Sequence, residues 1–418
     1  LALTPGNTMY WQSFVQITKH FPSSEFDQQL EDDLNQCFSM DSIDHQELVN
    51  VVARLVRNDT SAQELLPLPE TKRVEHFRNK LTAGALPGFL FKKWFLSAMA
   101  GCLLNDLYLE KLLTSLRHAL LLETDKLSDK GLLPLLCSLG QQCFINQFIY
   151  YQETDEQEQV KSLRKKIECA VDNDVALKPE PLAVLSCYTP LHQVTPNPHI
   201  EGHTGQSTSP LYQLLHRQVS APLTEFSLRP EIPNLNNTGD ITSAEVQEMN
   251  EDHPYLCWES LAHEVPRPFR RVISNLFPHI GIDRDRFENP DILVAGCGTG
   301  KQAIATARRH PKANVLAMDL SRSSLAFGQR RAKELGIANI EFKQGDILGL
   351  DDYKQRFDII ECDGVLHHLD DPTRGCSILT HLLKPGGFIR IGLFSELARR
   401  AIRDIRIFVD DQGYGHSP

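Results

Sequence analysis

Residues 291–300, DILVAGCGTG, decide the fold of the C-terminal part of this chain. A short apolar run, Ile292 to Ala295, predicts a buried strand, and a helix is expected from Lys301 to about Arg309. The sharp turn between them needs glycine torsions, and a ligand lying against this backbone needs the absence of Cβ atoms. Free N–H groups at the start of the helix favour a carboxylate or a phosphate. The segment therefore predicts a loop that binds a nucleotide-like ligand.

Two further strands supply acidic residues at the expected places. Residues 314–320, NVLAMDL, predict a strand that ends at Asp319, whose carboxylate can accept hydrogen bonds from both ribose hydroxyls of a nucleoside. Ser321 is expected to cap the next helix. The third strand, 340–343, leads to Asp346, which is placed to meet the exocyclic amine of adenine. A fourth strand beginning at Phe357, a helix, and a fifth strand within 382–394 follow, and this alternation predicts parallel βαβ units.

The glycine spacing separates two classes of nucleotide-binding loop. A dinucleotide loop has the spacing GxGxxG, but the position of its third glycine holds Lys301, and the run here is GxGxG. Together with the Gly345-Asp346 pair and LKPGG at 383–387, this spacing resembles class I S-adenosylmethionine-dependent methyltransferases over residues 266–410. The resemblance implies an α/β fold with a Rossmann-like sheet, and S-adenosyl-L-methionine as the cofactor.

The resemblance also implies which residues contact the cofactor. The glycine loop would hold the methionine end, Asp319 the ribose and Asp346 the adenine, while the chain around Asp363 would face the methionine amino group. The full expected set is Gly296, Cys297, Gly298, Thr299, Gly300, Asp319, Leu320, Gly345, Asp346, Ile347 and Asp363. In one departure, Val294 stands two residues before the first glycine, where family members commonly carry Asp or Glu.

Methyl transfer from a sulfonium is an in-line displacement, so the enzyme mainly aligns the reacting atoms and excludes water. A base is needed only if the nucleophile carries a proton that must leave. Asp363, His367 and His368 follow the fourth strand, and the two histidines are the candidate catalytic residues. The region lacks an NPPY-type motif, which disfavours amino groups of nucleobases or glutamine as acceptors. A cofactor-binding scaffold without turnover remains the alternative.

The upstream region is expected to be a separate α-helical domain over residues 1–190, joined by a linker and lid segment, 191–265, to the methyltransferase domain, 266–418. Residues 132–151, 248–261 and 392–406 resemble bacterial TPR-methyltransferase proteins, although no TPR array is visible. The helical domain would recruit a substrate or partner. Tyr255 and Trp258 are either a lid over the site or an aromatic pair that packs a helix.

Composition limits the remaining possibilities. The net charge of −11 over 418 residues argues against nucleic acid as a partner. The ten cysteines form no CxxC pair and no Cys/His run has zinc spacing, so we expect no metal and buried, reduced thiols in a cytoplasmic protein. No apolar stretch reaches the length of a membrane span. Because the first residue is Leu and only 24 residues follow Phe394, we expect a fragment at both ends, with the sheet truncated after strand five.

Overall fold

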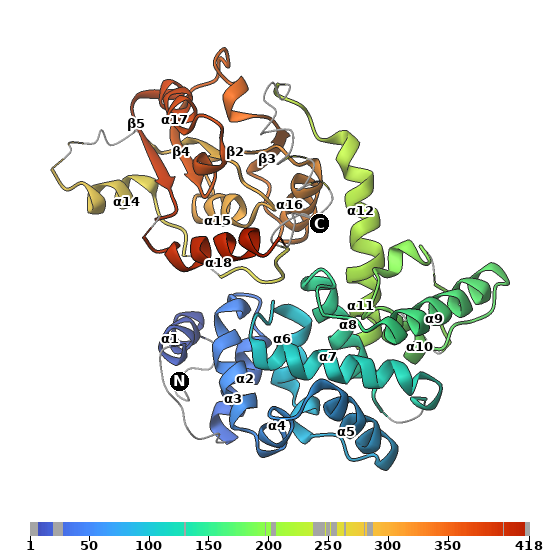
Figure 1. Cartoon of the computed structure of the whole chain (residues 1–418). Helices are drawn as coiled ribbons and strands as arrows, with labels where there is room; N and C mark the ends of the chain where they lie inside the picture. Colours follow the sequence, from blue (N-terminus) through green and yellow to red (C-terminus); the bar gives the residue numbers. More distant parts are fainter. Residues whose placement is uncertain are drawn as a thin grey trace. The chain divides into compact units, whose positions relative to one another are not determined.

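The computed structural model describes residues 7–19, 28–128, 131–196, 198–201, 206–236, 247, 251, 257–262, 265–279, 281, 287–395 and 397–413. The chain divides into two compact units (Figure 1). The helical unit comprises Leu1–Ser227 and Cys257–His263, and the sheet unit comprises Leu228–Leu256 and Glu264–Pro418. The expected linker and lid segment, 191–265, contributes residues to both units, and its role stays a prediction.

The helical unit is built from short amphipathic helices around one apolar core. Within it α5 packs on α7, α6 on α8, and α8 on α10 and α11. Helix α7 buries Leu109, Leu112, Leu113, Leu116 and Leu120, which recur at helical spacing. The bounds are α1 Thr8–Thr18, α2 Gln28–Phe38, α3 Val49–Asn58, α4 Thr60–Leu65, α5 Glu70–Ala83, α6 Lys93–Gly101, α7 Leu107–Leu122, α8 Leu133–Ile145, α9 Thr154–Asp172, α10 Pro179–Leu185, α11 Pro210–Leu215 and α12 Ala221–Leu228.

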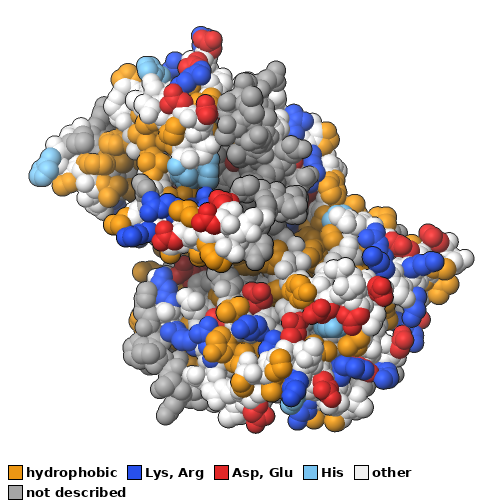
Figure 2. Space-filling view, in the orientation of Figure 1, with side chains coloured by type: hydrophobic (Ala, Val, Ile, Leu, Met, Phe, Trp, Pro, Cys, Tyr) orange, Lys and Arg blue, Asp and Glu red, His pale blue; other side chains and the backbone are white. Residues whose placement is uncertain are grey.

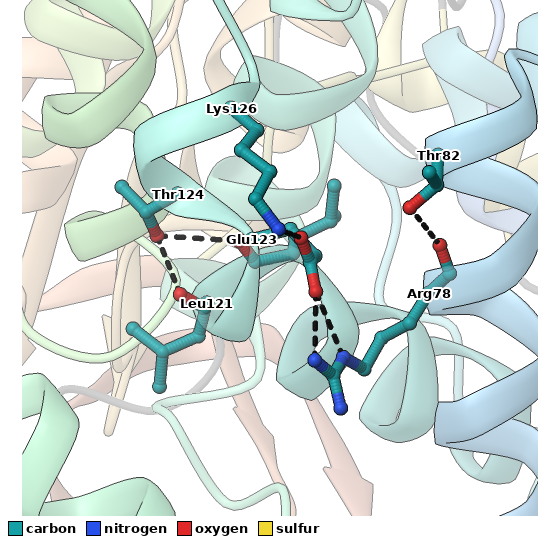
Figure 3. Close-up of polar contacts among 7 residues, drawn as sticks. Arg78, Thr82, Leu121, Glu123, Thr124 and Lys126 are labelled. Carbon is teal, nitrogen blue, oxygen red and sulfur yellow. Dashed lines mark hydrogen bonds and ion pairs between the residues drawn. The ribbon is translucent and has the colours of Figure 1, made fainter.

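Several buried charges of the helical unit are held in ion pairs. Glu123 follows α7 and is held by Arg78 and Lys126, whose nitrogens lie 2.8 Å and 2.7 Å from its carboxylate oxygens; Figure 3 shows both cations converging on it. Arg117 and Glu156 form a fully buried ion pair, with a nitrogen–oxygen distance of 3.2 Å. Removing one partner of such a pair leaves an uncompensated buried charge, so the loss of either residue is expected to destabilise the unit.

The sheet unit contains a parallel sheet in the order β3-β2-β1-β4-β5. The order reverses at β1, whose neighbours are β2 on one side and β4 on the other. In such open sheets ligands bind at the carboxyl ends of the strands where the order reverses. The bounds are α14 Phe269–Leu276, β1 Asp291–Ala295, α15 Lys301–Arg309, β2 Asn314–Asp319, α16 Arg322–Glu334, β3 Ile340–Gln344, β4 Phe357–Asp363, α17 Pro372–His381, β5 Leu383–Gly392 and α18 Arg400–Asp411.

The two faces of the sheet are covered by different helices. Helices α15 and α16 contact β2 and β3, and α17 contacts β5 (Figure 1). Leu293, Leu316 and Ile360 share a core cluster with residues of α17. Their neighbours in the strands, including Val294 and Ala317, are also buried. Both faces of the central strands are thus buried, which explains why those strands read as continuous apolar runs rather than alternating ones.

The predicted fold class, a Rossmann-like α/β sheet preceded by an all-α region, is confirmed. Cys102, Cys137 and Cys143 are buried and are not in disulfides. On the face drawn in Figure 2, basic and acidic side chains are intermixed over the helical unit rather than gathered by sign. No helix among the described residues is long and apolar enough to cross a membrane.

Candidate functional site

The glycine loop after β1 has the backbone conformation that its sequence requires. Gly296, Gly298 and Gly300 all have positive φ angles, of 73°, 52° and 81°. Such angles are accessible to glycine at little steric cost. At Gly296 a Cβ atom would also lie 2.3 Å from Cγ2 of Val365. Two features therefore require glycine at position 296. Its backbone has a positive φ angle, and a side chain there would clash with Val365 after β4.

Asp319 links the glycine loop to the end of β2. Its Oδ2 accepts a hydrogen bond of 2.7 Å from the backbone N–H of Gly298, and its Oδ1 accepts one of 3.1 Å from that of Ser321. Burial raises the pKa of the Asp319 carboxyl above its ordinary value, and these backbone donors oppose that shift. Asp319 thus fixes the loop as well as offering its oxygens to a ligand. Beside it, burial raises the pKa of the Cys297 thiol far above its ordinary value, so this thiol is not a nucleophile at neutral pH.

Asp346 lies at the end of β3 and has one unused oxygen. The residue is 2% exposed. Its Oδ1 accepts a 2.9 Å hydrogen bond from the N–H of Leu348, while its Oδ2 is buried and has no partner in the described structure. A buried carboxylate oxygen without a donor is costly. It is the acceptor that an exocyclic amine of adenine would satisfy.

A segment far upstream completes this side of the site. The backbone of Gln344 pairs with that of residues 233–235 through two 2.9 Å hydrogen bonds. The side chain of Asn236 then makes two hydrogen bonds with the backbone of Asp346, of 2.8 Å and 2.9 Å. Sequence reasoning missed Asn236, which lies in the segment expected to be a linker and lid, 191–265. A single side chain that bonds a backbone more than a hundred residues away leaves no local pattern in the sequence.

A second upstream residue, Glu251, contacts the start of α16. Its carboxylate accepts hydrogen bonds from the backbone N–H groups of Arg322 and Ser323, at 2.5 Å and 3.0 Å. The predicted cap, Ser321, accepts a 3.0 Å bond from the N–H of Ser324. The positive end of the helix is thus capped twice, next to the residue expected to take the ribose.

Asp363 is the last residue of β4, and its expected place near the methionine amino group stays a prediction. Its carboxylate forms an ion pair with Arg390 of β5. His367 and His368 lie in a 3₁₀ turn, Leu366–His368. Both ring nitrogens of His367 are buried and unpartnered within the described structure, and its ring packs against Phe394 with centroids 4.2 Å apart. Burial, then the neighbouring His368 and Arg399, lower the pKa of His367, so its imidazole is neutral at pH 7.

Comparison with known proteins shows what the C-terminal part of the chain is similar to. Residues 288–411 match the family model of a methyltransferase domain. This match and the order of the sheet support a class I methyltransferase domain in this part of the chain. An uncharacterized protein of Synechococcus sp. is 41% identical over 118 residues, which are 28% of this chain and 28% of that protein. The ubiquinone biosynthesis O-methyltransferase of Acinetobacter baumannii is 32% identical over 109 residues, 26% of this chain and 44% of that protein.

The structure of PKMT2 from Rickettsia typhi in complex with AdoHcy is 28% identical, with a TM-score of 0.30, over 34% of this chain and 28% of that chain. The matched segments therefore span less than half the length of each of these proteins.

The cofactor of the methyltransferase domain is S-adenosyl-L-methionine. The residues of the site fit it, because a loop with three glycines lies near two carboxylates, one of which has an unsatisfied oxygen. The expected cofactor residues all lie at the carboxyl ends of β1 to β4. Among them Thr299 and Ile347 are buried, and Leu320 offers its carbonyl to Gln344 at 3.0 Å. Their individual roles remain predictions.

The expected aromatic pair is only half described. Trp258 is buried and belongs to the helical unit, whereas Tyr255 lies outside the described residues, so the lid stays a prediction. Within the part of the chain that the structure describes, no group of three or more His, Cys, Asp or Glu is arranged to hold a metal ion.

Proposed function

We propose that this chain is an S-adenosylmethionine-dependent methyltransferase. The observation that carries the proposal is the pair of carboxylates beside the glycine loop. Asp319 is already bonded to the loop, and Asp346 keeps one buried oxygen without a donor. The arrangement suits an adenosine, whose ribose diol and exocyclic amine are hydrogen-bond donors. The bound cofactor would supply an electrophilic methyl group on a sulfonium.

We propose further that the acceptor carries a proton that His367 removes. A neutral imidazole with two buried, unpartnered nitrogens is a proton acceptor that nothing in the described structure occupies. Its turn directly follows β4, at the edge of the sheet where the glycine loop also lies. As the methyl carbon bonds to the acceptor atom and the carbon–sulfur bond breaks, the proton of the acceptor would pass to an imidazole nitrogen. A hydroxyl acceptor fits this chemistry, and the related ubiquinone biosynthesis protein is named an O-methyltransferase.

The helical unit, in this proposal, recruits the substrate or a partner. It has its own apolar core, and it exposes large apolar side chains at Ile149, Tyr151 and Val175, which are 71%, 63% and 55% exposed. A partner would contact these side chains if they form one contiguous apolar surface. The acceptor would then be a protein, a peptide or a small molecule.

The alternative is a scaffold that binds the cofactor without turning it over. Val294 favours it, because an acidic residue is expected there, and the ion pair of Asp363 with Arg390 removes a second polar contact. Two measurements separate the alternatives. Calorimetry with S-adenosylhomocysteine should show binding to the whole chain. An absence of binding would refute both the methyltransferase and the scaffold. Radiolabel transfer from the methyl donor into a cell lysate supports the enzyme, whereas binding without any transfer supports the scaffold.

A further inference from the structure

Glu361, in the middle of β4, is a buried carboxylate that the cofactor contacts do not explain. It is 5% exposed. Its Cα is the register partner of Val294 in β1, so the two side chains lie on the same face of the parallel sheet. Val294 is the position where a carboxylate was expected and is missing. The sheet therefore holds a carboxylate at this level and on this face, supplied by the neighbouring strand.

The partners of Glu361 belong to the helix that starts at the glycine loop. Its Oε2 accepts a hydrogen bond of 2.8 Å from Nε2 of Gln302 and one of 2.9 Å from Oγ1 of Thr306. Both donors are on α15, and Gln302 is the second residue of that helix, two positions after Gly300. A single oxygen thus ties the first two turns of α15 to the middle of the sheet.

The way its charge is held sets Glu361 apart from the other buried glutamates of the described structure. Glu31, Glu123 and Glu156 each form an ion pair with a Lys or an Arg. Glu361 is held by two neutral donors. Burying a charge without a cation is expensive. The carboxylate lies beside the first two turns of α15, and its two hydrogen bonds offset part of that cost.

We propose that Glu361 is a positioning residue for the cofactor. It holds the start of α15, and with it the glycine loop, at the distance from β4 that leaves the crevice open for the methionine end. The inference rests on the proposed function, since it assumes that the loop binds S-adenosylmethionine. Glu361 would not touch the ligand itself, and would affect its binding through the hydrogen bonds to Gln302 and Thr306.

The test measures the affinity of the whole chain for S-adenosylhomocysteine by calorimetry in four variants. Glu361→Ala leaves two donors without an acceptor, and we expect a dissociation constant at least about tenfold higher. Glu361→Gln keeps one oxygen that can accept both bonds, and we expect rescue to within about threefold of the unchanged protein. Thr306→Val removes one of the two donors at almost constant volume, and we expect an intermediate loss.

The matched control is Glu123→Ala. Glu123 is also 5% exposed, but it lies in the helical unit (Figure 3). We expect that variant to melt earlier and to bind with unchanged affinity. A second readout is hydrogen exchange of the backbone amides at 298–304, which should speed up in Glu361→Ala and not in the control.

The outcomes are distinct. If the unchanged chain does not bind S-adenosylhomocysteine, the proposed function fails and takes this inference with it. If it binds, and folded Glu361→Ala binds equally well, only the positioning role is overturned. Equal loss in Glu361→Gln and Glu361→Ala would overturn it too, because the retained oxygen should rescue. If Glu361→Ala does not fold, Thr306→Val decides, and unchanged affinity in that variant refutes the inference.

Discussion

Replacing Asp346 by Asn tests the adenine contact with almost no change in shape. In the unliganded chain Oδ1 of Asp346 accepts from the N–H of Leu348, and Oδ2 is buried without a partner. The carbonyl oxygen of Asn can keep the first bond. Its amide nitrogen then takes the place of Oδ2 and points a donor at the exocyclic amine, which is also a donor. Binding should suffer while the fold is preserved.

The magnitude follows from the kind of bond that is lost. A hydrogen bond to a charged group contributes about 1.5–3 kcal/mol. A factor of ten in affinity corresponds to about 1.4 kcal/mol, so we expect the dissociation constant of S-adenosylhomocysteine to rise by roughly 10- to 150-fold. The melting temperature without ligand should not fall, because the substitution exchanges an unpartnered charged oxygen for a neutral group.

Calorimetry with two ligands makes the test sharper. S-inosylhomocysteine carries a carbonyl where the adenine amine stands, so the Asn variant should favour it relative to S-adenosylhomocysteine. Asp351→Asn is the matched control, because Asp351 belongs to the same unit and its side chain is 57% exposed in an ion pair with Arg374. Such surface pairs are worth about 0–1 kcal/mol, and we expect no change in binding. An Asp346→Asn variant that binds S-adenosylhomocysteine within twofold of the unchanged chain refutes the adenine contact.

Four further predictions follow from single features of the structure. Gly296→Ala should abolish cofactor binding in calorimetry, because its Cβ would clash with the chain after β4, whereas Gly84→Ala, with a φ of 66° and open space, should cost only about 1–2 kcal/mol in urea unfolding. Asn236→Ala should weaken S-adenosylhomocysteine binding about five- to thirtyfold, since two hydrogen bonds to the backbone of Asp346 are lost. Unchanged affinity would contradict a role of Asn236 in placing Asp346. The pKa of His367 is lowered, so the rate of label transfer should be level above pH 7 and should fall as the pH drops, with a midpoint below the ordinary 6.5. His367→Gln should lower the rate of label transfer by a factor of about 10²–10⁴. Arg117→Met strands a buried carboxylate and should cost about 3–5 kcal/mol in urea unfolding of the helical unit, a prediction that a change under 1 kcal/mol would overturn.

The order and type of the elements in the sheet unit could be predicted from the sequence because local signals agree there. The expected helix from Lys301 to about Arg309 is observed as Lys301–Arg309, and Ser321 caps α16 as predicted. Apolar strands, glycine turns and caps are properties of consecutive residues, so they are legible in the chain. The carboxylates of Asp319 and Asp346 also lie where the strand ends placed them.

The sequence by itself determined the α/β fold class, the glycine loop and the class of ligand. Only the tertiary structure decided how the loop is held. Asn236 reaches Asp346, and Glu361 reaches α15, across separations that no local pattern records. The carboxylate missing at Val294 could be read from the sequence, but its counterpart on β4 could not, because the register that sets the two residues side by side exists only in the folded sheet. The glycine loop at 296–300 indicates a ligand because its glycines allow the required backbone torsions. Long-range hydrogen bonds, which only the folded structure shows, hold that loop and the residues around it in place.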